Sequence, residues 1–563
     1  MMKSFKWIII ILLLIFLSGF IYSRLFHLFY QQDEWVGVGD VIAYGSTRFL
    51  GKFSIISILA GSGRILGSIF NFIFYRYFTY QGFPFALFSI VVNFFNALLL
   101  YFVVQKLSKN TMLSYLASII FICLYTPIQA VTWFAANTTT LPSATFVFVS
   151  ILLLLQFMES NKRHYLILSQ VSAVVAYLFK ESGVIVFVIL PLLFINLSKN
   201  KVTIMKIFKI FWPIGVYLVF CLSVVLVNYL RIPANSAAFE ANTPFMKEKI
   251  LFNALFYPVV SISQIFIPDV YLYKFATLFQ SAMYPFINGN FMASSIRDNM
   301  TADVLSLYFS LIVIVVSVVV AYMVKRVGKI ILYALIFIGL SFLPYIILRR
   351  GGAYLDSRYF YLGSAGGALL LSAVLTGIAD RLKKYSKIYR YALFSMGIIL
   401  CFYIFVNVRL IRRNVAQLAS VSAERVQLLK QFTYLYPTLP NKPIVYITGD
   451  SNGYYGLTNV KVPLEQGPGY TLMIWYYPTG VVPREFFQND FLWEIRDQGY
   501  REVKGKGFGY YWDKNDLLNL FKQNPKLSEN QIVAFYYKSN DRLLLDISPQ
   551  IREYIRNNRT KSL

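Results

Sequence analysis

The sequence predicts an α-helical polytopic membrane protein that ends in a small C-terminal α+β domain. Of its 563 residues, 57% are hydrophobic and only 14% are charged, whereas soluble proteins average about 25% charged residues. The apolar residues form runs long enough to cross a bilayer, and the composition becomes that of a soluble domain near residue 434. These observations exclude a soluble enzyme and a disordered, collagen-like or disulfide-rich chain.

The apolar runs predict about eleven transmembrane helices, since each span needs about 20 mostly apolar residues. The first run follows the basic segment MMKSFK and has no small-residue cleavage pattern after it. We therefore expect an uncleaved first helix and not a secretory signal. The expected spans cover residues 7–22, 84–105, 112–127, 141–158, 165–179, 183–197, 208–230, 304–324, 330–348, 359–379 and 391–408.

The net charge of +27 comes mainly from basic residues that lie between apolar spans. That distribution disfavours a nucleic acid partner and leaves anionic lipid or a phosphate-bearing substrate. Cytoplasmic loops are enriched in Lys and Arg. A multi-pass protein of the cell membrane is therefore predicted, with a cytoplasmic N-terminus and an extracytoplasmic C-terminal domain. The basic inner loops are 106–109, 162–163, 199–209, 325–329 and 381–390, and a first outer loop is expected over about 24–83.

Three parts of the chain are expected: a transmembrane domain over 1–410, an amphipathic connecting helix over 411–433 and an α+β domain over 434–563. In the last part, β-branched and aromatic runs predict strands at 443–447 and 472–476 and a hairpin of 532–537 with 543–547. A helix is expected at 516–521. The three cysteines lie in apolar runs and the two histidines lie far apart, so neither a disulfide framework nor a His or Cys metal site is expected.

Nucleotide-binding motifs are absent from the sequence, and two groups of charged residues carry the candidate chemistry. Asp33 and Glu34 follow the first helix, where paired acids can act as a general base or hold a cation, although a solvated loop is the alternative. Lys180 and Glu181 interrupt an apolar stretch. The 15 residues 165–179 rise about 22 Å as a helix, short of the roughly 30 Å core, which places this pair near the outer boundary. A hairpin turn with snorkelling side chains is the alternative.

Arginines provide a third feature of the same predicted membrane face. Arg349, Arg350 and Arg358 lie at the outer end of two spans, and Arg64 lies in the first outer loop. Arginine binds phosphate oxygens with two parallel hydrogen bonds, whereas interfacial anchoring is the alternative. Acids and cations from four segments therefore converge on one face. This favours transfer of a group from a lipid-linked phosphate, with a lipid-carried sugar as the donor.

Five ordered stretches resemble the GT-C membrane glycosyltransferases, most closely the protein O-mannosyltransferase branch and its relatives that bear tetratricopeptide repeats. The resemblance covers about residues 1–380 and does not extend to the C-terminal part, which lacks such repeats. The stretches are DEW at 33–35, GRIL at 63–66, FSIVVNFFNALL at 88–99, FKESG at 179–183 and SRYFYLGS at 357–364.

The resemblance implies an inverting glycosyltransferase that uses a polyprenyl-phosphate sugar. It implies that Asp33 is the catalytic base, with Glu34 beside it, and that Lys180 and Arg358 lie near the donor phosphate. Arg64 belongs to a stretch in which the family has Arg-Pro-Leu and this chain has Ile65 for the proline. Further expected phosphate-binding and supporting residues are Arg349, Glu181, Tyr359 and Tyr361.

Several alternatives stay open at this stage. Some GT-C enzymes need a divalent cation, but the single acidic pair predicts no metal site and no other cofactor. The acceptor is a protein, a lipid or a glycan. A lipid-linked sugar flippase or transporter also needs basic groups, but it predicts charges in both halves of the membrane and often internal repeats. A non-catalytic scaffold that presents the C-terminal domain is the third possibility.

Overall fold

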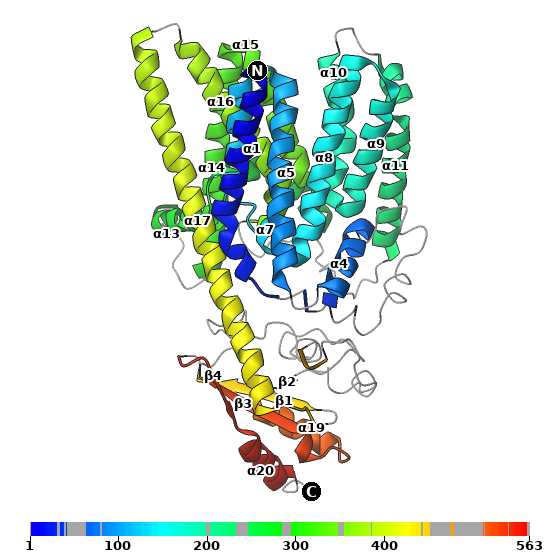
Figure 1. Cartoon of the computed structure of the whole chain (residues 1–563), viewed down its shortest axis with the longest axis vertical. Coiled ribbons are helices and arrows are strands. Elements are labelled where there is room, and N and C mark those ends of the chain that lie inside the picture. The colour runs from blue at the N-terminus through cyan, green and yellow to red at the C-terminus, as the bar shows by residue number, and fades with distance from the viewer. Residues whose placement is uncertain are drawn as a thin grey trace. The chain divides into compact units, whose positions relative to one another are not determined.

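The computed structural model describes most of the chain and divides it into two compact units (Figure 1). Unit 1 comprises 1–23, 53–70 and 87–414, and unit 2 comprises 24–52, 71–86 and 415–563. The residues described are 2–30, 34–35, 37–38, 41, 64–78, 81–198, 203–231, 246–283, 294–346, 354–383, 386–440, 443–450, 475–477, 510–511, 513–538 and 540–559.

Unit 1 is a bundle of long apolar helices. Over the described residues, eight helices are long and apolar enough to cross a membrane, which confirms a multi-pass membrane protein. Many of their large apolar side chains are exposed, as a lipid-facing surface requires. The helices that contain these spans are α1 (Met2–Tyr22), α5 (Gly82–Ser108), α8 (Phe134–Ser160), α11 (Ile204–Arg231), α14 (Ser294–Met323), α15 (Lys325–Phe342), α16 (Tyr361–Leu382) and α17 (Ser386–Leu435).

Three further predicted spans are helical but shorter. They are α6 (Thr111–Cys123), α9 (Arg163–Phe179) and α10 (Ile185–Leu197), with 13, 17 and 13 residues. At 1.5 Å per residue they rise about 20–26 Å, less than a bilayer core. All eleven predicted segments are therefore helices, of which eight have the length and composition of a span. α8 packs against α9, and α16 packs against α6 and α15.

A broken helix pair, α12 (Met246–Phe266) and α13 (Asp269–Met283), was not expected as a span. The two helices meet at an angle of 104° at a break that contains Pro268, and α13 lies across the bundle in Figure 1. The carbonyls of residues 264–267 accept hydrogen bonds from the side chains of Thr126, Tyr403 and Tyr354, at 2.7–3.1 Å. These side chains satisfy the carbonyls that a helix end leaves unpaired.

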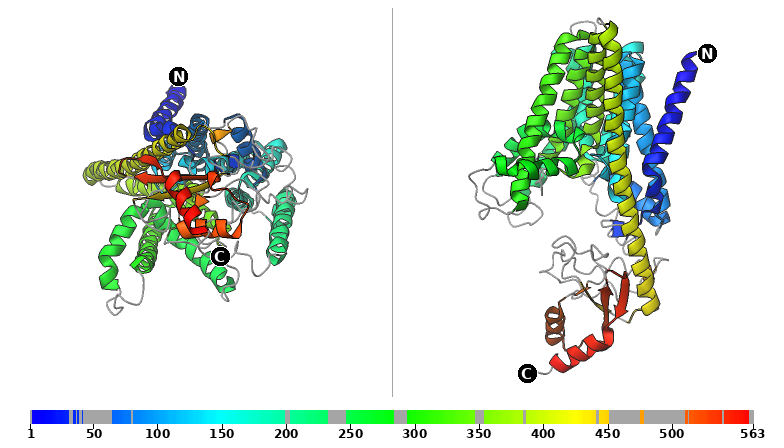
Figure 2. Two further views of the ribbon diagram at one scale, coloured as in Figure 1. Left: turned by 90° about the horizontal axis from the view of Figure 1, so that it is seen from below. Right: turned by 90° about the vertical axis from the view of Figure 1, so that its left-hand side faces the viewer.

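The last helix joins two elements that the sequence analysis kept separate. α17 runs without interruption for 50 residues from Ser386 to Leu435 (Figure 2), so the span expected over 391–408 and the connecting helix expected over 411–433 are one helix. No Pro or Gly falls between residues 398 and 435 to interrupt it. The division between the two units falls within α17, after residue 414.

Unit 2 contains the predicted α+β domain. Its sheet has the order β2-β1-β3-β4, formed by Tyr510–Tyr511, Ile444–Gly449, Ile532–Lys538 and Leu543–Asp546. β1 is parallel to β2 and β3, while β3 and β4 form the predicted antiparallel hairpin. The helices α19 (Lys514–Gln523) and α20 (Ser548–Arg559) bury their apolar faces, and α20 packs on β3. The helix predicted at 516–521 is α19.

The strand predicted over 472–476 differs from the structure. Residues 472–474 lie outside the described residues, and Trp475 and Tyr476 are helical. Their aromatic side chains suit a strand, but here they pack on the end of α17. The Tyr476 hydroxyl donates to the Tyr436 carbonyl at 2.6 Å, and Trp475 Nε1 donates to Thr433 Oγ1 at 3.4 Å. Tertiary packing therefore decides the local conformation.

Part of the expected first outer loop contributes an aromatic core to unit 2. The Tyr30 ring lies 5.3 Å from the Trp35 ring and 5.9 Å from the Phe85 ring, both edge to face. The Tyr30 hydroxyl also donates to the Phe78 carbonyl at 3.2 Å. Edge-to-face pairs add to the stabilisation gained from burial. Described residues of this loop therefore pack around Tyr30, and they include the helix α4 (Ile65–Tyr77).

Candidate functional site

Three of the predicted cations lie at the ends of helices in unit 1. Arg64 immediately precedes α4, Lys180 connects α9 to η2 (Glu181–Val184), and Arg358 lies in η4 (Ser357–Phe360) before α16. These positions lie outside or at the edge of the long spans. The contacts described below connect the three side chains to one another through shared aromatic and acidic neighbours, and we call the set the cation site.

Arg64 and Glu181 form a two-pronged ion pair. Arg64 Nε donates to Glu181 Oε2 at 2.8 Å and Nη2 donates to Oε1 at 2.7 Å. Although burial favours the neutral acid, Arg64 and Lys180 hold the pKa of Glu181 below its ordinary value. The backbone of Arg64 has φ of 52°, a left-handed conformation uncommon for a residue with a side chain. This strain is maintained where the guanidinium meets its partner.

Two glycines allow the segments of the cation site to approach closely. A Cβ atom on Gly183 would lie 2.5–2.7 Å from the backbone of Ala176 and Tyr177 in α9. A Cβ atom on Gly67 would lie 2.3 Å from Thr139 in α8. Only glycine fits at such distances. The turn after Lys180 can therefore fold back tightly on α9, and α4 can approach α8 with Arg64 at its start.

Lys180 is a buried ammonium group. Its side chain is 1% exposed, its Nζ donates to Thr140 Oγ1 at 2.8 Å, and Nζ lies 5.3 Å from the centre of the Tyr359 ring. Burial lowers the pKa of Lys180 to about 7, opposed by Glu181 and assisted by Arg64 and Arg358. A buried cation is costly unless an anion compensates it. The environment of Lys180 therefore favours an anionic ligand beside it.

The Arg358 guanidinium lies next to two aromatic rings. Its guanidinium carbon lies 4.2 Å from the centre of the Trp133 ring and 5.0 Å from that of Tyr359. Its Nη2 lies 2.9 Å from Asp356 Oδ2. A neighbouring aromatic ring restricts the orientation of a guanidinium and shields it from water. Both effects favour two-pronged binding of phosphate oxygens.

The segment that carries Arg358 is anchored to the chain before α8. Ser357 Oγ donates to the Thr126 carbonyl, and the backbone N–H of Gln129 donates to Ser357 Oγ at 3.2 Å. Gln129 begins the short helix α7 (Gln129–Thr132), which is followed by Trp133. These hydrogen bonds fix residue 358 next to Trp133. The Thr126 side chain also donates to carbonyls at the end of α12. Hydrogen bonds of Thr126 therefore connect the cation site to the broken helix pair.

Counted over the described residues, the charge at the cation site is positive. Three basic side chains, Arg64, Lys180 and Arg358, lie near two carboxylates, Glu181 and Asp356. A dianionic or monoanionic phosphate suits this balance, because cations at helix junctions stabilise phosphate by charge-assisted hydrogen bonds. In the described part of the chain, no group of three or more His, Cys, Asp or Glu residues is arranged to hold a metal ion.

The other predicted site residues are placed elsewhere or not described. Asp33 and Arg349 lie outside the described residues, as does Arg350. Glu34 is fully buried and belongs to unit 2. Tyr361 is also buried, and its hydroxyl donates to Asn93 at 2.7 Å in the helix core. Its role in the structure is therefore a hydrogen bond between α16 and α5.

Sequence reasoning missed three residues that surround the cation site. Trp133 and Thr140 lie in a long apolar stretch with no charged neighbour, and Tyr345 lies at the end of a span. Tyr345 packs against Tyr359, with ring centres 4.4 Å apart and ring planes tilted by 40°. A tryptophan or threonine in an apolar run is most often a packing residue. Only the contacts with Arg358 and Lys180 distinguish them.

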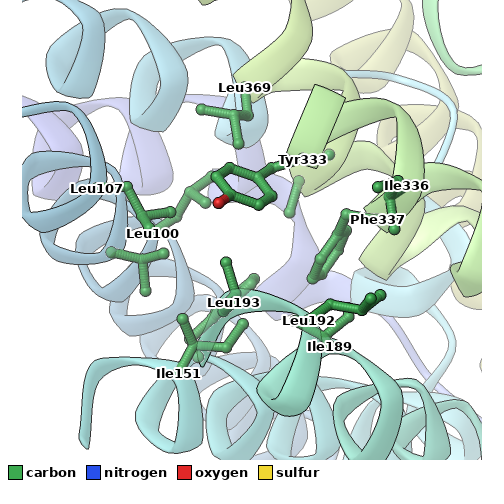
Figure 3. A pocket seen from close by; sticks show the side chains of 14 residues that line it. Leu100, Leu107, Ile151, Ile189, Leu192, Leu193, Tyr333, Ile336, Phe337 and Leu369 are labelled. Atoms are coloured by element: carbon green, nitrogen blue, oxygen red, sulfur yellow. The ribbon is translucent and has the colours of Figure 1, made fainter. Parts of the chain in front are cut away.

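An apolar cavity lies inside unit 1, between α5, α8, α10, α15 and α16 (Figure 3). It is partly open, with about 580 Å³ of unfilled space when the open part is included, and it is lined by 14 residues, most of them Leu, Ile, Val or Phe. The Tyr333 hydroxyl points into it (Figure 3) and has no hydrogen-bond partner among the described residues. Along α16, its lining residues 365–369 lie about 10–17 Å from Arg358.

Two solved structures show a distant similarity to this chain. One is the archaeal oligosaccharyltransferase AglB from Archaeoglobus fulgidus in complex with an inhibitory peptide and a dolichol-phosphate, with 9% identity, 84% of this chain and 64% of that chain covered, and a TM-score of 0.39. The other is the apo form of the Archaeoglobus fulgidus oligosaccharyltransferase, with 13% identity, coverages of 79% and 63%, and a TM-score of 0.41. The chain thus spans less than two thirds of the length of either protein. No family model and no curated protein matches the chain.

Proposed function

We propose that the protein is a GT-C membrane glycosyltransferase that transfers a sugar, with inversion, from a polyprenyl-phosphate donor to an extracytoplasmic acceptor. The observation that carries the proposal is the cation site, in which Arg64, Lys180 and Arg358 come from three separate segments of unit 1. Each segment belongs to one of the sequence stretches that resemble this family. The positive-inside distribution supports a site on the outer face of the cell membrane.

In the proposed reaction, the Asp33 carboxylate, with Glu34 beside it, accepts a proton from the acceptor hydroxyl. The hydroxyl oxygen forms a bond to the anomeric carbon, and the bond from that carbon to the phosphate oxygen breaks. The polyprenyl phosphate leaves with the electron pair of the broken bond. Lys180 and Arg358, with Arg64 and Arg349, stabilise the negative charge that develops on it. No step of this scheme requires a metal ion.

The apolar cavity suits the isoprenoid part of the donor. Its lining is almost free of polar atoms, and on α10 it begins at Ile189, about 14 Å from Lys180 along the chain of helical residues. A lipid whose phosphate lies in the cation site would extend its chain by this distance into the bundle.

A flippase for the same lipid is the second candidate function, because it needs the same phosphate-binding cations. The two functions differ in the carboxylate, which only the transferase needs as a base. The charges of the cation site lie in one set of helix junctions, and the repeats common in transporters are not visible in the sequence. The transferase is therefore favoured.

The test uses the purified full chain in lipid nanodiscs with polyprenyl phosphate mannose or polyprenyl phosphate glucose and a mixed pool of protein, lipid and glycan acceptors. Wild-type protein should release polyprenyl phosphate and form a glycosylated product. The Asp33→Asn variant should lose about 100-fold or more of this activity, because general base catalysis contributes that much. Asp380→Asn is the matched control, since Asp380 pairs with Lys383 at the other end of α16.

Two results would contradict the proposal. Full activity of Asp33→Asn removes the assignment of the base. Movement of the lipid across proteoliposome membranes without any transfer product favours the flippase.

A further inference from the structure

We propose that Gln129, Trp133 and Asn137 form a sugar-binding subsite that contacts the hydroxyl groups of the donor sugar. This inference rests on the proposed function and adds to it a set of residues that recognise the carbohydrate part of the donor. It is argued from polar atoms in unit 1 that are buried and unpaired next to the cation site.

Three polar atoms in this short stretch have no hydrogen-bond partner within the described structure. They are Gln129 Oε1, Trp133 Nε1 and Asn137 Oδ1. Burying such an atom without a partner costs about 1–3 kcal/mol, and folded proteins avoid it in nearly every case. Three instances within nine residues are therefore unusual for a segment that serves packing alone. Unpaired buried groups of this kind commonly mark a site where a ligand completes the hydrogen bonds.

Each of the three residues is connected to the cation site, either directly or through one neighbouring residue. The Trp133 ring lies under Arg358, with 4.2 Å between the guanidinium carbon and the ring centre. Gln129 donates its backbone N–H to Ser357, the residue before Arg358. Asn137 precedes Thr140 by three residues on α8, so both side chains share one helix face, and Thr140 accepts the Lys180 hydrogen bond.

The chemistry of the unpaired atoms selects a hydroxylated ligand. Gln129 and Asn137 offer acceptor oxygens, whereas Trp133 offers a donor N–H. An ionised phosphate has only acceptor oxygens, so it satisfies Trp133 but neither amide oxygen. A hydroxyl group donates one hydrogen bond and accepts others, so it can satisfy all three. A sugar joined to a phosphate in the cation site would bring several hydroxyl groups close to these three residues.

Two of the three residues lie at the edge of the protein core. Gln129 and Trp133 are partly exposed as residues, although their unpaired atoms are buried, and the Arg358 side chain is 22% exposed. Asn137 is fully buried, and its amide nitrogen donates to Ser89 on α5. This hydrogen bond holds the amide plane, so the unpaired oxygen has a fixed direction. A fixed acceptor of this kind can discriminate between sugars that differ in one hydroxyl group.

The experiment compares two probes bound to the full chain in nanodiscs. The probes are a polyprenyl phosphate hexose, as the mannose and the glucose form, and bare polyprenyl phosphate of the same chain length. The variants are Gln129→Met, which keeps a similar side-chain size, and Trp133→Phe, which keeps a ring under Arg358 but lacks the N–H. Matched controls are Gln156→Met at the other end of α8 and Trp212→Phe, whose side chain is 53% exposed on α11.

Wild-type protein should bind at least one hexose form more tightly than the bare lipid. Each variant should weaken hexose binding by about 2- to 10-fold, the effect of one neutral hydrogen bond, and should leave binding of the bare lipid within 2-fold. The control variants should change neither affinity. Retained binding of the bare lipid also shows that the variants are folded.

Three results would overturn the inference. The first is equal binding of the hexose and bare lipids by wild-type protein, which means that the sugar is not contacted. The second is unchanged hexose binding in both variants. The third is an equal loss for both probes, which indicates an effect on Arg358 and not on the sugar. If wild-type protein binds neither probe, the proposed function itself fails, and the subsite fails with it.

Discussion

Replacing Lys180 by methionine should stabilise the folded protein while it weakens binding of the donor phosphate. Lys180 is buried and its pKa is about 7, compared with an ordinary value near 10.5. That difference corresponds to roughly 5 kcal/mol by which the folded protein disfavours the ammonium form. Lys180→Met keeps a side chain of similar length and removes this cost. Its melting temperature at pH 6 should therefore be higher than that of wild-type protein.

The pH dependence of stability shows whether the buried charge of Lys180 causes this difference in melting temperature. Between about pH 7 and 10.5, the unfolded chain keeps the Lys180 proton that the folded chain has lost, so the stability of wild-type protein rises with pH in this window. Below pH 7, Lys180 is protonated in both the folded and the unfolded chain, so the full cost of burying its charge remains. The advantage of Lys180→Met should therefore be largest near pH 6 and should disappear towards pH 10.5. The measurement is thermal unfolding of the protein in detergent at a series of pH values.

The same substitution should reduce binding of bare polyprenyl phosphate. A hydrogen bond to a charged group is worth about 1.5–3 kcal/mol, so the affinity should fall by about 10- to 150-fold below pH 7. The affinity of wild-type protein should decrease as pH rises through about 7, because the ammonium loses its proton, and the variant should lack this decrease. Lys430→Met, at an exposed position of α17, is the matched control and should behave like wild-type protein.

Two outcomes would refute this reasoning. A melting temperature of Lys180→Met below that of wild-type protein at pH 6 means that Lys180 contributes a net stabilising interaction. Unchanged binding of polyprenyl phosphate means that Lys180 is not a phosphate ligand. Both comparisons use the difference between variant and wild type, so other titrating groups cancel to first order.

Two further substitutions test the local geometry by thermal unfolding. Gly183→Ala should cost about 1–3 kcal/mol, because its Cβ would overlap the α9 backbone, whereas Gly339→Ala, with its nearest atom 3.7 Å away, should have little effect. Equal stability of these two variants would show that the turn after Lys180 has room for a side chain. Tyr354→Phe should also cost about 1–3 kcal/mol by leaving the Ile267 carbonyl unpaired. Tyr391→Phe, at a 77% exposed position, is its control, and an equal effect of both changes would contradict the role of Tyr354 at the helix break.

The helical segments and the C-terminal hairpin follow from local sequence patterns. Apolar runs of sufficient length form helices in a membrane because every backbone group must be paired within the segment. Each of the eleven predicted runs contains a helix, although the run predicted over 112–127 is helical only as far as Cys123. The β-branched and aromatic run at 532–537 and the apolar run at 543–547, with a short polar turn between them, likewise predict the antiparallel pair.

The broken pair α12–α13 does not follow from local patterns. Its sequence contains polar residues such as Asn253, Ser261 and Gln264, which lower the apolar character of the run. The helix can break at Pro268 within the bundle only because side chains from distant segments pair the carbonyls that the break leaves unpaired. A sequence window contains no information about these partners.

The residue types of the candidate site and their convergence on one membrane face were predicted from the chain alone, whereas the direct contacts between their side chains were not. An arginine before a helix, a Lys-Glu pair between apolar runs and an arginine after a span are visible in any reading of the sequence. Arg64 and Glu181 are separated by 117 positions, and the loop-closure entropy for joining them is repaid by helix packing that no local pattern encodes. The burial of Lys180, the stacking of Arg358 on Trp133 and the unpaired polar atoms beside them exist only in the folded bundle.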